Sequence, residues 1–202
     1  MTDSRLIASI TAKWEKIASS NSLLSSIYAY PYREVVAREV SLASVKDTDY
    51  VVNIGCGAVP FTAIHVARIS GAQVWAMERE PDTAQAARQC IQRLGLEQSI
   101  TIIEGDAAEG VPEGFTAAFV ALQAEPKNEI LNRLVQTGKA DARLVFRAAS
   151  SLFEGQYDDL DHQLHSSGCV HHNMATFDRS LLYLLGENIQ VDAGRGDENG
   201  CE

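Results

Sequence analysis

Four short segments of this sequence carry residues suited to binding a small molecule. The first joins an apolar run to a helical pattern and contains Gly55, Cys56, Gly57, Ala58 and Pro60. Its glycines let the backbone approach a ligand, and the helix that follows offers free N–H groups. The other three contain Glu78 and Arg79, then Gly105, Asp106 and Ala107, then Leu122 and Gln123. A carboxylate at Glu78 can accept hydrogen bonds from both hydroxyls of a ribose, and Asp106 can bind an adenine edge, so these segments together predict a nucleoside site.

The four segments follow strands in a region where strands and helices alternate. Short apolar runs predict strands at 50–54, 72–78, 99–106, 115–123 and 142–150. Helical patterns between them cover 60–70, 82–96 and 126–139, and Gly95 is placed to end the second helix. This alternation predicts an α/β fold with a mostly parallel, doubly wound sheet. Ligands of such sheets bind beyond the carboxyl ends of the strands, where the four segments converge.

The residues before this region predict helices. Apolar residues between Leu6 and Ile17 recur at helical spacing, and a Ser/Asn-rich stretch after them is expected to end that helix. A second helix, with Pro31 in its first turn, is expected to run to about Ser44. We therefore expect residues 1–48 to form a short helical cover on the sheet.

The residues after this region predict a terminal antiparallel hairpin. The segments 169–177 and 180–188 have strand-like composition, with a tight turn expected at Asp178–Arg179. The α/β domain is expected to span residues 49–190. The polar segment 191–202 is expected to be a disordered tail.

Composition limits the partners of the chain. The 202 residues carry a formal net charge of −10, with a sequence pI of about 4.9. Phosphate binding needs a basic face, so this balance argues against a nucleic-acid partner. No apolar run approaches the ~20 residues that span a bilayer, and the N-terminus lacks the apolar stretch of a secretory signal. The cysteines form no CxxC pair, so we expect a reduced, cytoplasmic protein. We expect one domain that binds a small molecule, and the oligomeric state is left open, a homodimer included.

The spacing of the glycine loop, the acid at Glu78 and the Gly105-Asp106 pair resembles the S-adenosylmethionine (SAM) site of the class I methyltransferase fold, which is Rossmann-like. Val59 and Pro60 stand where a dinucleotide fingerprint would have its third glycine, which lowers the expectation of NAD. The resemblance implies that SAM is the ligand, used here as a substrate. Asn53 departs from this pattern, because many methyltransferases have an acid there.

A narrower resemblance is to the nicotianamine synthases. The loop GCGAVPFTAI is similar to that family's glycine loop, and SIYAYPYREVV to its aromatic segment. LVFRAASSLFEGQY and VHHNMATFDRSLLYL look like its fifth strand and terminal hairpin, so the resemblance covers residues 27–186. Family members also carry a long N-terminal helical domain that supplies a catalytic glutamate. This sequence has only a short segment there, so that glutamate cannot be carried over onto it, and the sequence looks closest to the small azetidine-2-carboxylate synthases.

This resemblance implies attack at the γ carbon of the methionyl arm of SAM, with release of 5′-methylthioadenosine. The expected reaction is cyclisation, in which the amine of SAM attacks its own γ carbon and forms azetidine-2-carboxylate. The alternatives are transfer of the 3-amino-3-carboxypropyl group to a small amine, methyl transfer to a small molecule, and SAM binding without turnover. Enzymes choose among these carbons by placing the nucleophile in line with the breaking bond.

The candidate catalytic residues are Tyr32, Tyr30, Arg147 and Ser150. An aromatic cage that includes Tyr28 could stabilise the sulfonium, and Arg147 could hold the ligand carboxylate. Ser150, Ser151 and Tyr157 could add polar contacts. The plainer alternatives are that the tyrosines only pack and that Arg147 pairs with a structural acid. Glu39 is expected to be a solvated helix residue.

A cluster of soft ligands lies near the hairpin: His162, His165, Cys169, His171 and His172. Such residues can bind zinc or nickel. However, His171 and His172 would point to opposite faces of a strand. We therefore expect no metal. Cys56 is expected to contact the ligand through its backbone and not to act as a nucleophile.

Overall fold

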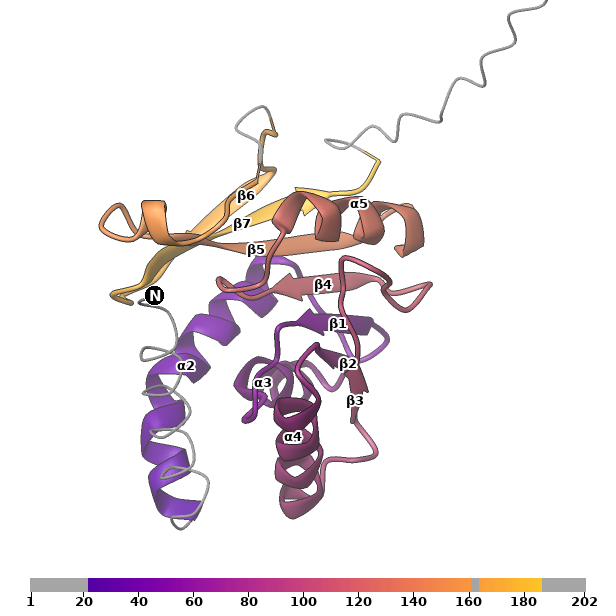
Figure 1. The fold of residues 1–202 in the computed structure, drawn as a ribbon, viewed down its shortest axis with the longest axis vertical. Helices are drawn as coiled ribbons and strands as arrows, with labels where there is room; N and C mark the ends of the chain where they lie inside the picture. The colour runs from indigo at the N-terminus through magenta and orange to yellow at the C-terminus, as the bar shows by residue number, and fades with distance from the viewer. Residues whose placement is uncertain (1–21, 161–163, 187–202) are drawn as a thin grey trace, which may run out of the picture.

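The computed structural model describes residues 22–160 and 164–186, with side chains described from Tyr32 onward. Within these residues one sheet has the strand order β3-β2-β1-β4-β5-β7-β6 (Figure 1). The strands are β1 Tyr50–Ile54, β2 Gln73–Glu78, β3 Ile100–Glu104, β4 Ala117–Val120, β5 Arg143–Ala149, β6 Gly168–His171 and β7 Phe177–Leu184. The first five are parallel, and β7 runs antiparallel to both β5 and β6. The predicted α/β fold and terminal antiparallel hairpin are confirmed.

Helices cover both faces of the sheet. They are α2 Ser22–Leu42, α3 Phe61–Ser70, α4 Pro81–Leu94 and α5 Lys127–Thr137, and a short 3-10 helix, η1, spans Glu154–Gln156. Successive strand residues point to opposite faces, so Val51 packs with α2, α3 and α4, whereas Val52 packs with α5. Figure 1 shows the sheet separating α5 from the other three helices. Gly95 ends α4 in the left-handed conformation, as the sequence predicted.

The predicted start of α2 is wrong. The helix begins at Ser22, so Pro31 lies in its interior. The second half of the serine-rich stretch is therefore part of the helix. Serine costs a helix only a few tenths of a kcal/mol relative to alanine, and packing overrides both serine and the hydrogen bond that proline removes. The packing comes from α3 and from β6, where Arg38 donates a hydrogen bond of 2.9 Å to the carbonyl of His171. The helix expected between Leu6 and Ile17 lies outside the described residues.

The predicted turn at Asp178–Arg179 is also wrong. Both residues belong to β7, and the connection from β6 runs through residues 172–176. Pairing with β5 decides this, because Ala148 stands opposite Arg179 and Arg147 opposite Ser180. The long antiparallel partnership outweighs the local turn preference of an Asp. Among the described helices, none combines the length and apolar character needed to cross a membrane.

Candidate functional site

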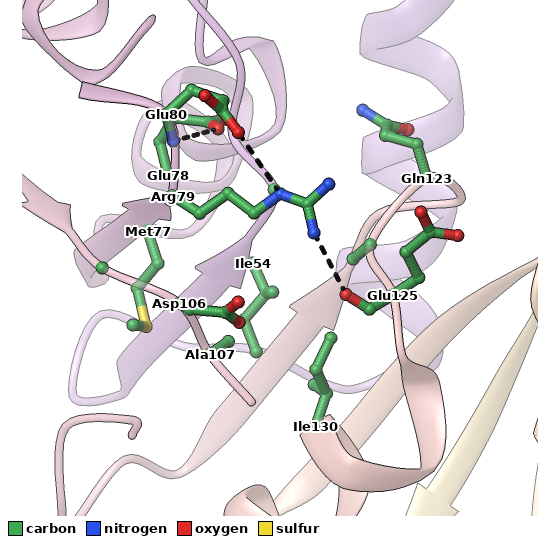
Figure 2. A pocket seen from close by; sticks show the side chains of 13 residues that line it. Ile54, Met77, Glu78, Arg79, Glu80, Asp106, Ala107, Gln123, Glu125 and Ile130 are labelled. Carbon is green, nitrogen blue, oxygen red and sulfur yellow. Dashed lines mark hydrogen bonds and ion pairs between the residues drawn. The ribbon is translucent and has the colours of Figure 1, made fainter. Parts of the chain in front are cut away.

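A cleft opens at the carboxyl ends of β1 to β4 (Figure 2). Seven of the predicted ligand-binding residues line it: Gly55, Glu78, Arg79, Gly105, Asp106, Ala107 and Gln123. Sequence reasoning missed the rest of the wall, which is Ile54, Met77, Glu80, Ala124, Glu125 and Ile130. Most of these missed residues are direct sequence neighbours of predicted ones, so extending each motif by one or two positions would have found them.

The glycine loop is fixed by hydrogen bonds to β2. The N–H groups of Gly55 and Cys56 both donate to the carbonyl of Met77, at 3.1 and 3.0 Å. Gly55 has φ +74° and Gly57 has φ +69°, backbone conformations that favour glycine. A Cβ at Gly55 would also lie 3.2 Å from the Cβ of Ala121. The loop therefore needs glycine for its conformation and, at Gly55, for close packing on the segment that follows β4.

Two carboxylates in the cleft hold the loops that surround them. Glu78 accepts hydrogen bonds from the N–H of Gly57 at 2.9 Å and the N–H of Glu80 at 3.2 Å, one on each oxygen. Asp106 accepts from the N–H of Ala108 at 2.8 Å. A carboxylate has about four lone-pair sites, so each keeps acceptor capacity for a ligand. This arrangement suits a ribose at Glu78 and a hydrogen-bond donor at Asp106.

Arg79 crosses the cleft from the end of β2 to the loop after β4. Its Nε lies 3.7 Å from a carboxylate oxygen of Glu80, and its Nη1 donates to the carbonyl of Glu125 at 3.4 Å. Figure 2 shows the extended side chain joining the two sides. Both contacts are long and the side chain is half-exposed, so Arg79 can move when a ligand enters.

Five predicted ligand-binding residues are not part of the cleft lining: Cys56, Gly57, Ala58, Pro60 and Leu122. Cys56 is buried, and burial together with the charge of Glu78 raises the pKa of its thiol to about 12. It therefore stays protonated at neutral pH, which suits the expected absence of a nucleophilic role. Pro60 precedes α3, and its carbonyl accepts the N–H of Ile64.

Leu122 and the loop after β4 are held by a buried lysine that the sequence reasoning missed. Lys127 donates from Nζ to the carbonyls of Leu122 and Asp158, and its backbone N–H donates to the Asp158 carboxylate. Burial lowers the pKa of Lys127, while the nearby acids oppose that shift. The lysine joins the cleft loop after β4 to the segment after β5.

Arg147 lies at the centre of a buried hydrogen-bonded network. Its Nε and Nη2 each donate to one oxygen of Glu39, both at 2.8 Å. Nη2 also donates to Thr62 at 3.0 Å, and Nη1 donates to the hydroxyl of Tyr32 at 2.5 Å. Burial alone would lower the pKa of Arg147, but the Glu39 carboxylate outweighs it and the pKa is raised. The guanidinium edge that could fork onto a ligand carboxylate is thus taken by Glu39.

The prediction for Glu39 is wrong, because this residue is completely buried. On α2 it stands beside Val36, Val40 and Ala43, the helix face that packs into the core. That i, i+3, i+4 spacing is the signal that could have revealed it. The side chain also accepts a hydrogen bond of 2.7 Å from Ser180, whose oxygen lies 2.9 Å from Nε2 of His172.

Six residues are joined by these hydrogen bonds, and we call them the buried network: Tyr32, Glu39, Thr62, Arg147, His172 and Ser180. Burial lowers the pKa of His172, with Glu39 opposing and Arg147 reinforcing that shift, so the imidazole is neutral at pH 7. The network joins α2, α3, β5 and β7 with the residue that follows β6. Sequence reasoning named Arg147 and Tyr32 but could not join them to the other members.

Tyr32 packs among aromatic side chains beside the glycine loop. Its ring centroid lies 5.9 Å from that of Phe61, the first residue of α3, and 6.5 Å from that of Phe177. The guanidinium carbon of Arg147 lies 5.0 Å from the Tyr32 ring centroid and 5.3 Å from that of Phe177. In this structure the cation that packs against the Tyr32 and Phe177 rings is therefore the Arg147 guanidinium. The predicted contributions of Tyr30 and Tyr28 fall outside the described side chains.

The remaining candidates of the loop after β5 have structural contacts. Ser150 donates from Oγ to the carbonyl of Ala175 at 2.8 Å, and its N–H donates to the carbonyl of Thr176. Tyr157, like Tyr32, packs against a cluster that includes Leu122 and Phe177, and Ser151 is exposed. None of the three lines the cleft.

The histidine-rich segment is divided in the structure. His172 is buried in the network, whereas His171 is exposed on β6, with its Nε2 4.0 Å from the Sγ of Cys169. His162 lies outside the described residues. Among the residues that are described, no group of three His, Cys, Asp or Glu side chains is placed to hold a metal ion.

The strand order, the terminal antiparallel pair, the glycine loop and the acid at the end of β2 define a class I SAM-methyltransferase fold. Residues 14–145 match the model of the protein-L-isoaspartate(D-aspartate) O-methyltransferase (PCMT) family, and the chain belongs to this family.

Solved structures extend this likeness over most of the chain. A point mutant of the nicotianamine synthase MtNAS in complex with S-adenosylmethionine superposes with a TM-score of 0.72 at 26% identity, covering 85% of this chain and 70% of that chain. MtNAS in complex with MTA and tNA gives 0.70 at 26% identity, covering 83% and 66%. The resemblance to nicotianamine synthases is thus confirmed.

One curated relative is the L-histidine 2-aminobutanoyltransferase of Yersinia pestis, 29% identical over 125 residues. The match covers 62% of this chain and 47% of that protein, so this chain spans about half the length of this relative. Another is a probable cobalt-precorrin-6B C(15)-methyltransferase of Methanothermobacter thermautotrophicus, 28% identical over 131 residues, 63% of this chain and 66% of that protein.

Proposed function

We propose that this chain binds SAM in the cleft, with the ribose on Glu78 and the adenine edge at Asp106. The observation that carries the proposal is the convergence of the glycine loop and these two carboxylates at the ends of β1, β2 and β3. A related protein of the same fold has been crystallised with SAM. The methionyl arm then extends over β1 and β4 toward Tyr32, because β4 and β5 continue the sheet on that side.

We further propose that a nitrogen nucleophile attacks the γ carbon of the methionyl arm. The nitrogen lone pair forms the N–Cγ bond, and the Cγ–S electron pair returns to sulfur, which neutralises the sulfonium. The products are 5′-methylthioadenosine and an N-alkylated amine, whose extra proton passes to water. Two likenesses support this carbon over the methyl: that to nicotianamine synthase and that to an enzyme named as an aminobutanoyltransferase.

The first candidate for the nucleophile is the amine of SAM itself, which would give azetidine-2-carboxylate. This reaction needs a folded methionyl arm and a neutral amine, but no second binding site. Glu39 is a buried carboxylate that is linked to Tyr32 through Arg147, and its oxygens are committed to Arg147 and Ser180. It is thus not available to anchor or deprotonate a separate amine.

The second candidate is transfer of the 3-amino-3-carboxypropyl group to a small external amine. The observation that favours it is the Yersinia pestis relative, whose name gives L-histidine as the acceptor. The bond changes at the γ carbon are the same, and only the source of the nitrogen differs. A single product analysis therefore separates the two candidates.

The test is incubation of the pure protein with SAM alone and with SAM plus L-histidine, followed by mass spectrometry. Methylthioadenosine with azetidine-2-carboxylate from SAM alone supports cyclisation. Methylthioadenosine that forms only with histidine, together with a coupled product, supports transfer. S-Adenosylhomocysteine would show methyl transfer and contradict both candidates. Unchanged SAM in both incubations would also contradict both, and the alternative of SAM binding without turnover would remain.

Two variants make this assay specific to the cleft. Asp106→Ala removes a cleft carboxylate and should abolish most of the product. Glu97→Ala removes an acid that lies outside the cleft and should leave the product unchanged. Equal product from both variants would show that the activity does not arise in this cleft.

A further inference from the structure

We infer that the buried Glu39–Arg147 pair positions the hydroxyl of Tyr32 so that its proton is donated to the carboxylate of the methionyl arm. This inference rests on the proposed SAM binding and deepens it. It gives the Tyr32 hydroxyl, together with the remaining N–H on Nη1 of Arg147, the contact that sequence reasoning gave to Arg147 alone. Glu39 becomes a positioning residue that acts through Arg147.

The hydrogen bonds fix where the Tyr32 proton can point. Arg147 donates to the Tyr32 oxygen, so the oxygen is an acceptor on that side and its own proton must be directed elsewhere. Arg147 has five N–H donors, and four of them have acceptors in the network. The fifth is on Nη1, the atom 2.5 Å from the Tyr32 oxygen. Two donors on neighbouring atoms match the two oxygens of a carboxylate.

The path proposed for the methionyl arm, from the cleft across the ends of β1 and β4, leads toward Tyr32. Its ring packs on Phe61, directly after the glycine loop, and it adjoins the cluster of Leu122 and Ala149 at the ends of β4 and β5. Leu122 is followed by Gln123, which lines the cleft. Tyr32 keeps partial exposure while Arg147 is 4% exposed, so a ligand reaches the tyrosine before the arginine.

The rest of the network holds Glu39 in place. Ser180 donates its hydroxyl proton to Glu39, so its oxygen must accept the Nε2–H of His172. This fixes one tautomer of the neutral imidazole and leaves Nδ1 unprotonated, without a partner among the described residues. With both its oxygens engaged, Glu39 fixes the guanidinium plane, and the guanidinium fixes the direction of the Tyr32 hydroxyl.

Binding of two ligands tests the inference. Methylthioadenosine shares the adenosine and sulfur of SAM but lacks the amino-acid arm. By calorimetry, Tyr32→Phe should weaken SAM binding by about 10-fold or more, the size of one hydrogen bond to a charged group, and leave methylthioadenosine within about twofold. Tyr50→Phe is the matched control. Tyr50 begins β1, at the end away from the glycine loop, and its ring packs on Trp75. Equal weakening of both ligands by Tyr32→Phe would overturn the inference.

A double-mutant cycle separates positioning from mere support of the fold. Glu39→Gln should weaken SAM binding in the wild-type background but add nothing in the Tyr32→Phe background, while it lowers the melting temperature in both. Additive losses of SAM affinity would overturn the role of Glu39. If Glu39→Gln does not fold, Ser180→Ala removes one hydrogen bond to Glu39 and is tested in the same cycle.

The two proposals fail in different ways. Wild-type protein that binds SAM without consuming it refutes the proposed reaction but still allows the ligand comparison. Wild-type protein that binds neither SAM nor methylthioadenosine overturns SAM binding and the inference together.

Discussion

The polar groups of the cleft and those of the buried network are hydrogen-bonded in opposite ways. In the cleft, carboxylates accept hydrogen bonds from backbone N–H groups of neighbouring loops and keep free lone pairs for a ligand. In the network, side chains satisfy one another away from water, and Glu39 and Ser180 have no exposed surface. The cleft is therefore suited to recognising the adenosine that SAM and methylthioadenosine share. The network is suited to holding the Tyr32 hydroxyl in one orientation.

The largest expected difference between the two regions is in stability. Glu39→Ala leaves the buried Arg147 cation without its partner and should lower the free energy of unfolding by about 3–5 kcal/mol. Glu78→Ala, in the cleft, removes two hydrogen bonds to backbone groups near solvent and should cost about 1 kcal/mol. Urea unfolding of both variants measures the difference. Equal losses would show that the network contributes no more to stability than the cleft.

Ligand affinity should reverse that order. Asp106→Ala removes a charged hydrogen-bond acceptor from the cleft and should weaken SAM binding by about 1.5–3 kcal/mol, measured by calorimetry. Because methylthioadenosine carries the same adenosine, its affinity should fall by the same factor. A loss confined to SAM would place the methionyl arm, and not the adenosine, at Asp106.

Two glycines of the loop distinguish conformational strain from crowding. Gly57→Ala forces a side chain into a left-handed conformation with open space around it, which should cost about 1–2 kcal/mol. Gly55→Ala carries the same strain and also brings its Cβ to 3.2 Å from Ala121, so it should cost more. Thermal unfolding of the pair checks this order. A larger loss at Gly57 would contradict the described packing of the glycine loop on the segment that follows β4.

The smallest expected effect is the pH dependence from His172. The folded state lowers the pKa of this imidazole from its usual 6.5, chiefly through burial, with Arg147, Arg38 and His171 adding to the effect and Glu39 opposing it. The unfolded chain therefore binds the proton more readily, and stability should be complete above pH 6.5 and decline as the pH falls below it. His172→Gln should flatten this decline in melting temperature between pH 7.5 and 5.5. An unchanged slope would show that other groups cause it.

Much of the cleft was predictable because each of its motifs is local. The glycine loop, Glu78 and the Gly105-Asp106 pair each follow a strand directly, and the carboxyl ends of parallel strands meet at one edge. The same logic gave the alternating elements from β1 to β5. Ile130 was missed because it reaches the cleft from helix α5, far along the chain from the predicted motifs, so no pattern at a strand end records it.

The errors occurred where packing overrides local preference. Pro31 was expected to start a helix, and Asp178 to form a turn, on their own propensities. Helix α2 continues through the proline, and β7 continues through the aspartate, where the register shifts, because β5 pairs with the residues on both sides of Asp178. Glu39 was expected to be solvated because most glutamates are, although its helix face is otherwise apolar.

The sequence by itself determined the α/β fold, the alternation of strands and helices and the sheet edge where the predicted site residues meet, because these depend on hydrophobic period and on residues adjacent in the chain. Only the tertiary structure decided the partners of Arg147. Glu39 is 108 positions away from it, Thr62 is 85 and Tyr32 is 115, so no local pattern links them. A buried charge takes whichever opposite charge the packed helices and strands bring within hydrogen-bond distance, and that is a property of the assembled core.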